Sequence, residues 1–265
     1  MRILIFLLLF CFYCFTERKE EEKGIKPILK EYNIEGSTMQ YAVAPSNQEK
    51  LILFIHGSPG SLKAFSDYLE DKILQKKAVL ISVDRYGYGG SNKGKAELSL
   101  ANQAKSIAPI LEKYRLPTLV IGHSYGGPVA VRLAMDYPKY ISSVLLLAGS
   151  IDPELEKVLW YQKLANWRLV RFILPSFLDV SNQEILPLRF ELKKMEHLWK
   201  NIKIPMTLIQ GDNDSLVLPA NVDYAQRMIS DKTKLKIIRG DMNHFLPWNE
   251  YELVRKEILE MIEQN

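Results

Sequence analysis

The stretch TLVIGHSYGGPVAVRLA, residues 118 to 134, decides the fold. An apolar run ends in a glycine, a serine stands between two glycines, and a helix-like pattern begins at once, which predicts a strand, a sharp turn and a helix. Gly122 and Gly126 allow strand and helix to approach more closely than side chains would permit. Pro128 falls in the first helical turn, where a missing N–H costs nothing. Ser124 is then either part of a structural turn or an exposed nucleophile.

The rest of the chain alternates apolar runs with amphipathic segments. Residues 39–44 have strand character, and buried strands are predicted at 50–57, 77–84, 116–124, 141–149, 204–211 and 233–240. Helical patterns occupy 61–74, 98–114, 126–138, 218–229 and 251–262. This alternation predicts an α/β fold, with a mostly parallel central sheet and helices on both faces. A length of 265 residues suits one such domain.

Strand patterns disappear between Ser150 and about Lys203, where residues 154–174 and 184–202 look helical. We interpret this segment, about 150–203, as a helical cap inserted into an α/β domain of residues 24–265. Four aromatic residues of the cap suggest either an apolar substrate pocket or packing between cap and core: Trp160, Trp167, Phe172 and Phe177.

The polar residues of interest each follow a predicted strand: His56, Asp84, Ser124, Asp214 and His244. Carboxyl ends of parallel strands lie at one edge of the sheet, where such folds bind ligands. The arrangement therefore predicts that these residues gather at one site.

A serine becomes a good nucleophile only when a base takes its proton. His244 lies in a loop between the last strand and the final helix, so it is the predicted base. The other three histidines have different expected roles: His123 is structural because the turn points it away, His197 is solvated on a cap helix, and His56 orients its loop.

The base needs a carboxylate to fix its tautomer. Residues 211–222, GDNDSLVLPANV, offer Asp212 and Asp214, of which one is expected to serve a turn or a helix cap. We prefer Asp214. The chain order serine, acid, histidine then matches one hydrolase fold and no other serine-hydrolase fold.

An oxyanion hole needs two N–H donors near the nucleophile. The backbone N–H groups of Ser58 and Tyr125 are the candidates, although the HGSPG segment at 56–60 also reads as a plain strand-ending turn. Asp84 and Arg85 are expected to tie strand ends and loops together rather than to act on substrate.

Together these segments resemble the α/β-hydrolase fold family, in its capped, single-domain serine hydrolases. The matching motifs are HGSPG (56–60), DRYGYGGS (84–91), GHSYGG (122–127), GDNDSLVLPANV (211–222) and NHFLPW (243–248). The acid-loop register falls on Asp214, although Leu218 stands where the family often has proline. Ser124 replaces the aspartate nucleophile of dehalogenases and epoxide hydrolases, and Tyr125 stands where proline aminopeptidases usually have tryptophan.

The resemblance implies a serine hydrolase that cleaves an ester-type bond of a small, partly apolar substrate through an acyl-enzyme, with no cofactor or metal. Two alternatives remain. One is a proline-aminopeptidase-like peptidase, for which HGSPG argues, and the other is a ligand-binding protein with little turnover. A net charge of +4 from scattered lysines gives no sign of nucleic-acid binding.

The first fifteen residues, MRILIFLLLFCFYCF, read as a signal peptide followed by a charged tether that ends at residue 23. We expect export, with possible membrane attachment as a bacterial lipoprotein through Cys14. Tyr13 stands where that signal normally has a small residue. The alternative is a buried N-terminal helix in a cytoplasmic protein.

Overall fold

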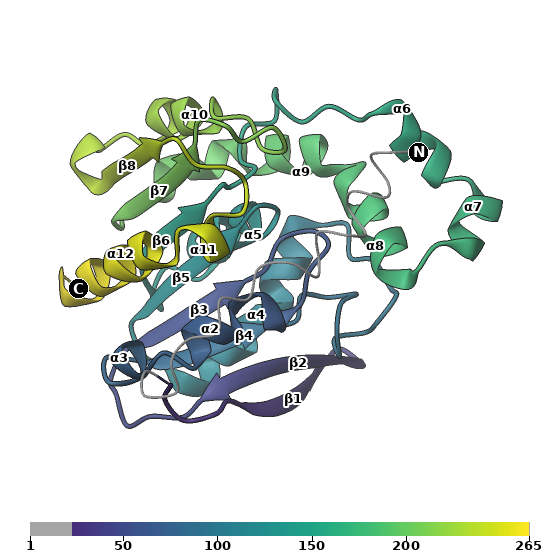
Figure 1. The fold of residues 1–265 in the computed structure, drawn as a ribbon. Helices are drawn as coiled ribbons and strands as arrows, with labels where there is room; N and C mark the ends of the chain where they lie inside the picture. The colour runs from purple at the N-terminus through teal and green to yellow at the C-terminus, as the bar shows by residue number, and fades with distance from the viewer. Residues whose placement is uncertain (1–22, 265) are drawn as a thin grey trace.

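The computed structural model describes residues 23–264, so the predicted signal or lipoprotein segment lies outside the described residues and stays a prediction. Eight strands form one sheet in the order β1-β2-β4-β3-β5-β6-β7-β8 (Figure 1). They are β1 (Ile28–Ile34), β2 (Ser37–Ala44), β3 (Leu51–Ile55), β4 (Val79–Val83), β5 (Thr118–His123), β6 (Ile141–Leu147), β7 (Met206–Gly211) and β8 (Leu235–Gly240). From β4 to β8 all neighbours are parallel, which confirms the mostly parallel sheet.

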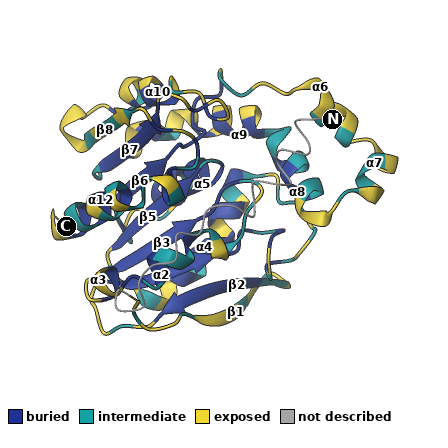
Figure 2. Ribbon diagram, in the orientation of Figure 1, coloured by how far each residue is buried: buried dark blue, intermediate teal, exposed yellow. Residues whose placement is uncertain are grey.

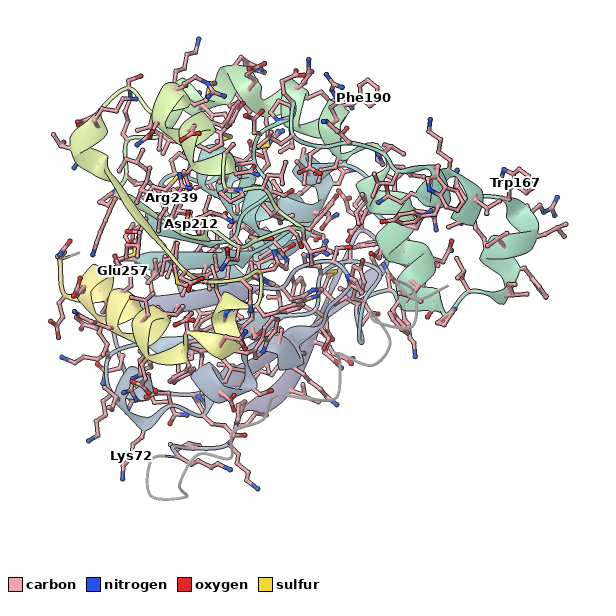
Figure 3. The ribbon with its side chains drawn as sticks, turned by 45° about the horizontal axis from the view of Figure 1, so that its top comes forward. Lys72, Trp167, Phe190, Asp212, Arg239 and Glu257 are labelled. Atoms are coloured by element: carbon pink, nitrogen blue, oxygen red, sulfur yellow. The ribbon has the colours of Figure 1, made fainter. Side chains whose placement is uncertain are left out.

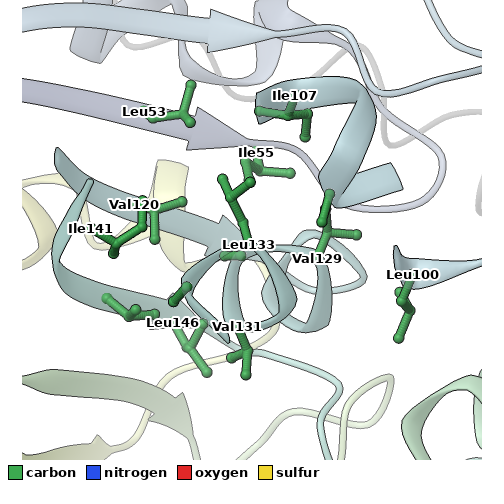
Figure 4. Close-up of a cluster of buried hydrophobic side chains, with 14 of the residues drawn as sticks. Leu53, Ile55, Leu100, Ile107, Val120, Val129, Val131, Leu133, Ile141 and Leu146 are labelled. Carbon is green, nitrogen blue, oxygen red and sulfur yellow. The ribbon is translucent and has the colours of Figure 1, made fainter. Parts of the chain in front are cut away.

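Helices cover both faces of the sheet, as predicted. One face carries α4 (Leu100–Tyr114), α5 (Gly126–Asp136) and α10 (Asn221–Met228); the other carries α2 (Ser66–Leu69), α3 (Lys72–Gln75), α11 (Leu246–Asn249) and α12 (Tyr251–Gln264). Successive side chains of a strand point to opposite faces. Leu53 and Ile55 therefore join the first core, where Figure 4 shows them beside Val129 and Leu133, while Phe54 joins the second. The central strands are buried throughout (Figure 2).

Strand β1 was not predicted. It pairs with β2 through a two-residue turn, in which Glu35 and Gly36 have φ of 49° and 78°. Two left-handed residues in succession suit the twist of a hairpin. Most β1 side chains are exposed, so the strand lacks the apolar run that revealed the others. The Glu-Gly pair is the one local signal for it.

The helix predicted over residues 61–74 is broken into three pieces, η3 (Leu62–Phe65), α2 and α3. The Asp71 carboxylate accepts hydrogen bonds from the N–H groups of Ile73 and Leu74 and so starts α3 afresh. In the helix that starts afresh at Asp71, Ile73 is 46% exposed, whereas Leu62 of the preceding piece is buried.

The segment between β6 and β7 is helical, as predicted, but it forms short pieces instead of two long helices. They are α6 (Trp160–Ala165), α7 (Arg168–Ile173), α8 (Ser176–Ile185), α9 (Leu188–Met195) and η4 (Glu196–Asn201). Pro175 and Pro187 stand immediately before α8 and α9, where proline ends a preceding helix. Leu192 and Trp199, from α9 and η4, belong to the main core.

Helices α6, α7 and α8 extend to one side of the body in Figure 1, and we call residues 157–185 the arm. Three aromatic residues of the arm fit neither of the roles predicted for them, which were to line an apolar substrate pocket or to pack between cap and core. Trp160, Trp167 and Phe172 are 75%, 66% and 90% exposed, so they neither pack against the core nor enclose a pocket. Figure 3 shows Trp167 pointing away from the body at the far edge of the arm.

Candidate functional site

Ser124 occupies a sharp turn between β5 and α5. Its φ is 54°, in the left-handed region that side chains other than glycine rarely adopt. Two hydrogen bonds hold this conformation, from Ser124 N–H to the Leu147 carbonyl (3.0 Å) and from Gly127 N–H to the Ser124 carbonyl (2.9 Å). Such a conformation costs on the order of 1–3 kcal/mol and persists where surrounding structure imposes it.

The flanking glycines are required because backbone fills the space where side chains would stand. A Cβ on Gly122 would overlap the carbonyl oxygen of Gly126, and a Cβ on Gly126 would overlap the carbonyl oxygen of Ile55. The helix α5 therefore packs directly against the ends of β3 and β5, as the sequence predicted for Gly122 and Gly126.

Gly126→Ala is expected to lower the free energy of unfolding by about 3 kcal/mol, because the new methyl group must displace backbone. Gly240→Ala is the matched control, since a Cβ there would meet only the end of the Met242 side chain at 3.6 Å. It should change stability by about 0.5 kcal/mol or less. Urea denaturation measures both, and equal losses for the two variants would contradict the close approach.

His244 and Asp214 form a buried pair at the carboxyl ends of β8 and β7. His244 Nδ1 lies 2.8 Å from Asp214 Oδ2, and both side chains are almost fully covered. Burial raises the pKa of Asp214, but the hydrogen bonds from His244 and from the N–H groups of Val217 and Leu216 outweigh it and lower that pKa below its ordinary value. The ionised carboxylate accepts a hydrogen bond from the Nδ1–H of His244, and this tautomer of the imidazole presents Nε2 as a proton acceptor.

The structure separates the two candidate acids. Asp212 lies at the surface, where its carboxylate pairs with Arg239 at 2.6 Å, and both side chains are nearly half exposed (Figure 3). Only Asp214 contacts the histidine, and it also accepts the N–H groups that turn the acid loop. Asp214 thus combines the two functions that were expected to be divided between the aspartates.

His123 supports His244 from behind. Its Nε2 lies 3.0 Å from the His244 carbonyl oxygen, and its ring stands edge-on to Trp248. Burial, followed by repulsion from His244, lowers the pKa of His123 to about 3, so the ring stays neutral. This supports the structural interpretation of His123. His197 lies exposed on η4, away from the pair.

The loop after β3 lies directly against the serine turn. A Cβ on Gly57 would stand 2.9 Å from the Cβ of Ser124. His56 orients this loop, because its Nδ1–H donates to the Gly57 carbonyl (2.7 Å) and its Nε2 accepts the Arg85 N–H (3.0 Å). Within residues 23–264, the backbone N–H groups of Ser58 and Tyr125 have no hydrogen-bond partner, so both are free to donate.

Arg85 fixes the same loop from beneath. Its guanidinium donates to the carbonyl oxygens of His56 and Gly57, both at 2.9 Å, and forms a fully buried ion pair with Glu184 at 2.8 Å. Burial alone would lower the pKa of Arg85, but the Glu184 carboxylate raises it above its ordinary value. The arginine is therefore a permanent charge at the centre of the site's supporting structure.

Glu184 and Ser181 are the residues that sequence reasoning missed. Both lie on α8, and Ser181 accepts a hydrogen bond from the Ser58 hydroxyl at 2.8 Å. Glu184 is 99 residues from Arg85, inside a polar helical pattern that gives no local sign of burial. The arm is thus tied to the loop that carries the Ser58 amide.

Asp84 has a structural function. Its carboxylate accepts the N–H groups of Leu62 (2.7 Å) and Gly90 (2.9 Å) and so joins two loops. Among the described residues, no group of three or more histidine, cysteine, aspartate or glutamate side chains is placed to hold a metal ion.

Comparison with known proteins shows which fold this architecture resembles. The family described as alpha/beta hydrolase fold matches residues 50–172. A solved structure, a putative lipase from Acinetobacter baumannii AYE, superimposes with a TM-score of 0.67 at 19% identity, covering 91% of this chain and 93% of that one. With the sheet order and the serine turn, these matches show that the chain has the alpha/beta hydrolase fold.

Two curated relatives show how far the likeness extends. An uncharacterized protein from Mycobacterium bovis is 28% identical over 149 residues, which are 54% of this chain. The match spans only 42% of that relative's length. The monoglyceride lipase of Mus musculus is 22% identical over 208 residues, covering 65% of this chain and 68% of the lipase.

Proposed function

We propose that this protein is a serine hydrolase that cleaves an ester-type bond through an acyl-enzyme. The observation that carries the proposal is the buried His244–Asp214 pair at 2.8 Å, formed at the same sheet edge as the left-handed serine turn. A histidine whose Nδ1 is held by a carboxylate presents Nε2 as a general base, which is what a serine nucleophile needs.

In this scheme His244 Nε2 takes the Ser124 proton as the serine oxygen attacks the acyl carbonyl carbon. The N–H groups of Ser58 and Tyr125 donate to the oxyanion, and collapse of the intermediate expels the alcohol, which takes the proton from His244. Water, deprotonated by His244, then attacks the acyl carbonyl carbon. The bond between the acyl group and Ser124 breaks, Ser124 takes the proton back from His244, and the acid is released. Every group in the cycle comes from the chain and solvent.

Two observations favour esters among possible substrates. Ser124 stands at the turn, and an activated serine forms an acyl-enzyme most readily with esters and thioesters, whose leaving groups are better than those of amides. Two of the similar proteins reported above are named as lipases, which are ester hydrolases: the monoglyceride lipase at 22% identity and the putative lipase at 19%. These likenesses support the ester class but set no acyl length.

A fluorophosphonate probe tests the nucleophile. The wild-type chain is expected to carry the covalent label, because only an activated serine reacts, and Ser124→Ala is expected to carry none. Circular dichroism of both proteins serves as the control for folding. A folded wild type that takes no label would overturn the proposal and would favour a ligand-binding protein with little turnover.

A substrate panel then separates the reaction classes. Matched acyl esters, acyl thioesters and aminoacyl amides are offered at equal concentration, and kcat/KM is measured for each. We expect esters to be turned over fastest. Faster release of an N-terminal proline from the amides would show instead a proline-aminopeptidase-like enzyme.

A further inference from the structure

The outer surface of the arm is unusually apolar. More than half of the strongly exposed large apolar side chains in the described chain lie within residues 158–177. The most exposed of them, between 66% and 90%, are Trp160, Trp167, Leu169, Phe172 and Ile173. Exposed apolar residues gathered in this way mark an interaction surface, whereas scattered ones do not.

The same surface carries unpaired positive charge. Residues 157–174 contain four basic side chains and no acidic one. Lys157, Lys163 and Arg168 are exposed and have no acidic partner among the residues described, while Arg171 pairs with Asp179 at 2.8 Å. Exposed apolar and cationic side chains therefore alternate along residues 157–174.

We propose that the outer surface of the arm, residues 157–174, docks onto an anionic lipid bilayer. Tryptophan favours the level of the lipid headgroups, apolar side chains enter the acyl boundary, and lysine and arginine bind the anionic headgroups. No helix within residues 23–264 is long and apolar enough to cross a membrane. A symmetric contact with a second copy would bring the same unpaired cations together, which costs free energy.

The arm is connected to the candidate site through hydrogen bonds and an ion pair. Asn182 on α8 donates to the Gln162 carbonyl of α6 at 3.0 Å, and the Arg171–Asp179 pair joins α7 to α8. Because α8 also carries Glu184 and Ser181, a docked arm holds the candidate site beside the bilayer surface. The docking surface itself does not depend on the proposed hydrolysis.

Tryptophan quenching by brominated lipid tests the contact in the full chain. All four tryptophans lie at or beyond residue 160, so attachment through the first fifteen residues alone would give no signal. With brominated phosphatidylcholine vesicles containing phosphatidylglycerol, about half of the emission should be quenched, since two of the four tryptophans lie on the arm. The double variant Trp160→Phe/Trp167→Phe should lose this quenching.

Two further variants test the chemistry of the surface. Lys157→Gln/Lys163→Gln/Arg168→Gln should need about tenfold or more anionic lipid for half-maximal quenching, because each cation near the surface favours binding. Phe172→Ser should weaken quenching in the same assay. Phe190→Ser is the matched control, since this exposed phenylalanine lies on α9 away from the arm (Figure 3), and it should change nothing.

Three results would overturn the proposal. The first is sedimentation with vesicles without quenching of Trp160 and Trp167, which would assign attachment to the N-terminal segment. The second is equal quenching on vesicles of phosphatidylcholine alone. The third is a blue-shifted, concentration-dependent emission without lipid, accompanied by a dimeric mass in light scattering, which would show that a second copy covers the surface.

Discussion

Asp214→Asn is expected to lower kcat/KM for an activated ester about 10⁴-fold, with little effect on folding. An asparagine at this position can donate its amide hydrogen to His244 Nδ1, which favours the wrong tautomer and removes the charge that stabilises the imidazolium. The loss should appear mainly in kcat, because the histidine acts in the transition state. Steady-state kinetics on a chromogenic ester measures it.

Asp212→Asn is the matched control, two residues away on the same loop. Its carboxylate pairs with the exposed Arg239, and such pairs contribute about 0–1 kcal/mol. Activity should stay within about twofold of the wild type. If instead Asp212→Asn lost activity and Asp214→Asn kept it, the assignment of the acid would be wrong.

Glu184→Gln is expected to lower the free energy of unfolding by about 3–5 kcal/mol. The substitution keeps the shape of the side chain but removes its negative charge. The Arg85 guanidinium then stays charged without a compensating partner, and both side chains of the pair are 0% exposed. It also takes the carboxylate acceptor from the Tyr88 hydroxyl, which donates to Glu184 at 2.6 Å. Guanidinium denaturation measures the change.

Glu263→Gln provides the comparison, because it breaks an ion pair with Lys77 in which both side chains are largely exposed. It should cost about 1 kcal/mol or less. The activity of Glu184→Gln should fall even where the variant is folded, since Arg85 orients the loop with the Ser58 amide. Unchanged stability and activity would show that α8 does not support the site.

The sequence predicted those parts of the site whose chemistry appears in a local pattern. Ser124 lies between two glycines that follow a strand, and His244 and Asp214 follow strands at the same sheet edge. The choice of Asp214 over Asp212 as the partner of His244 was also supported by the register of the acid loop in the family that the sequence resembles. Such residues can be found from sequence because parallel strands bring their carboxyl ends together wherever they occur along the chain.

What the sequence could not reveal depends on partners far along the chain. Glu184 looks like one more polar position on an exposed helix, and only the fold places it against Arg85. The exposure of Trp160 and Phe172 was likewise unpredictable, since an apolar aromatic residue on a short helix fits burial as well as exposure. Strand β1 was missed because an edge strand needs no apolar face.

The left-handed backbone at Ser124 has an evolutionary consequence. A glycine at this position would adopt the same conformation without strain and would make the protein more stable, yet it would have no hydroxyl. Selection for stability alone would therefore replace the serine. The hydroxyl at this turn therefore comes at a cost of about 1–3 kcal/mol in stability, which the packing of the rest of the fold offsets.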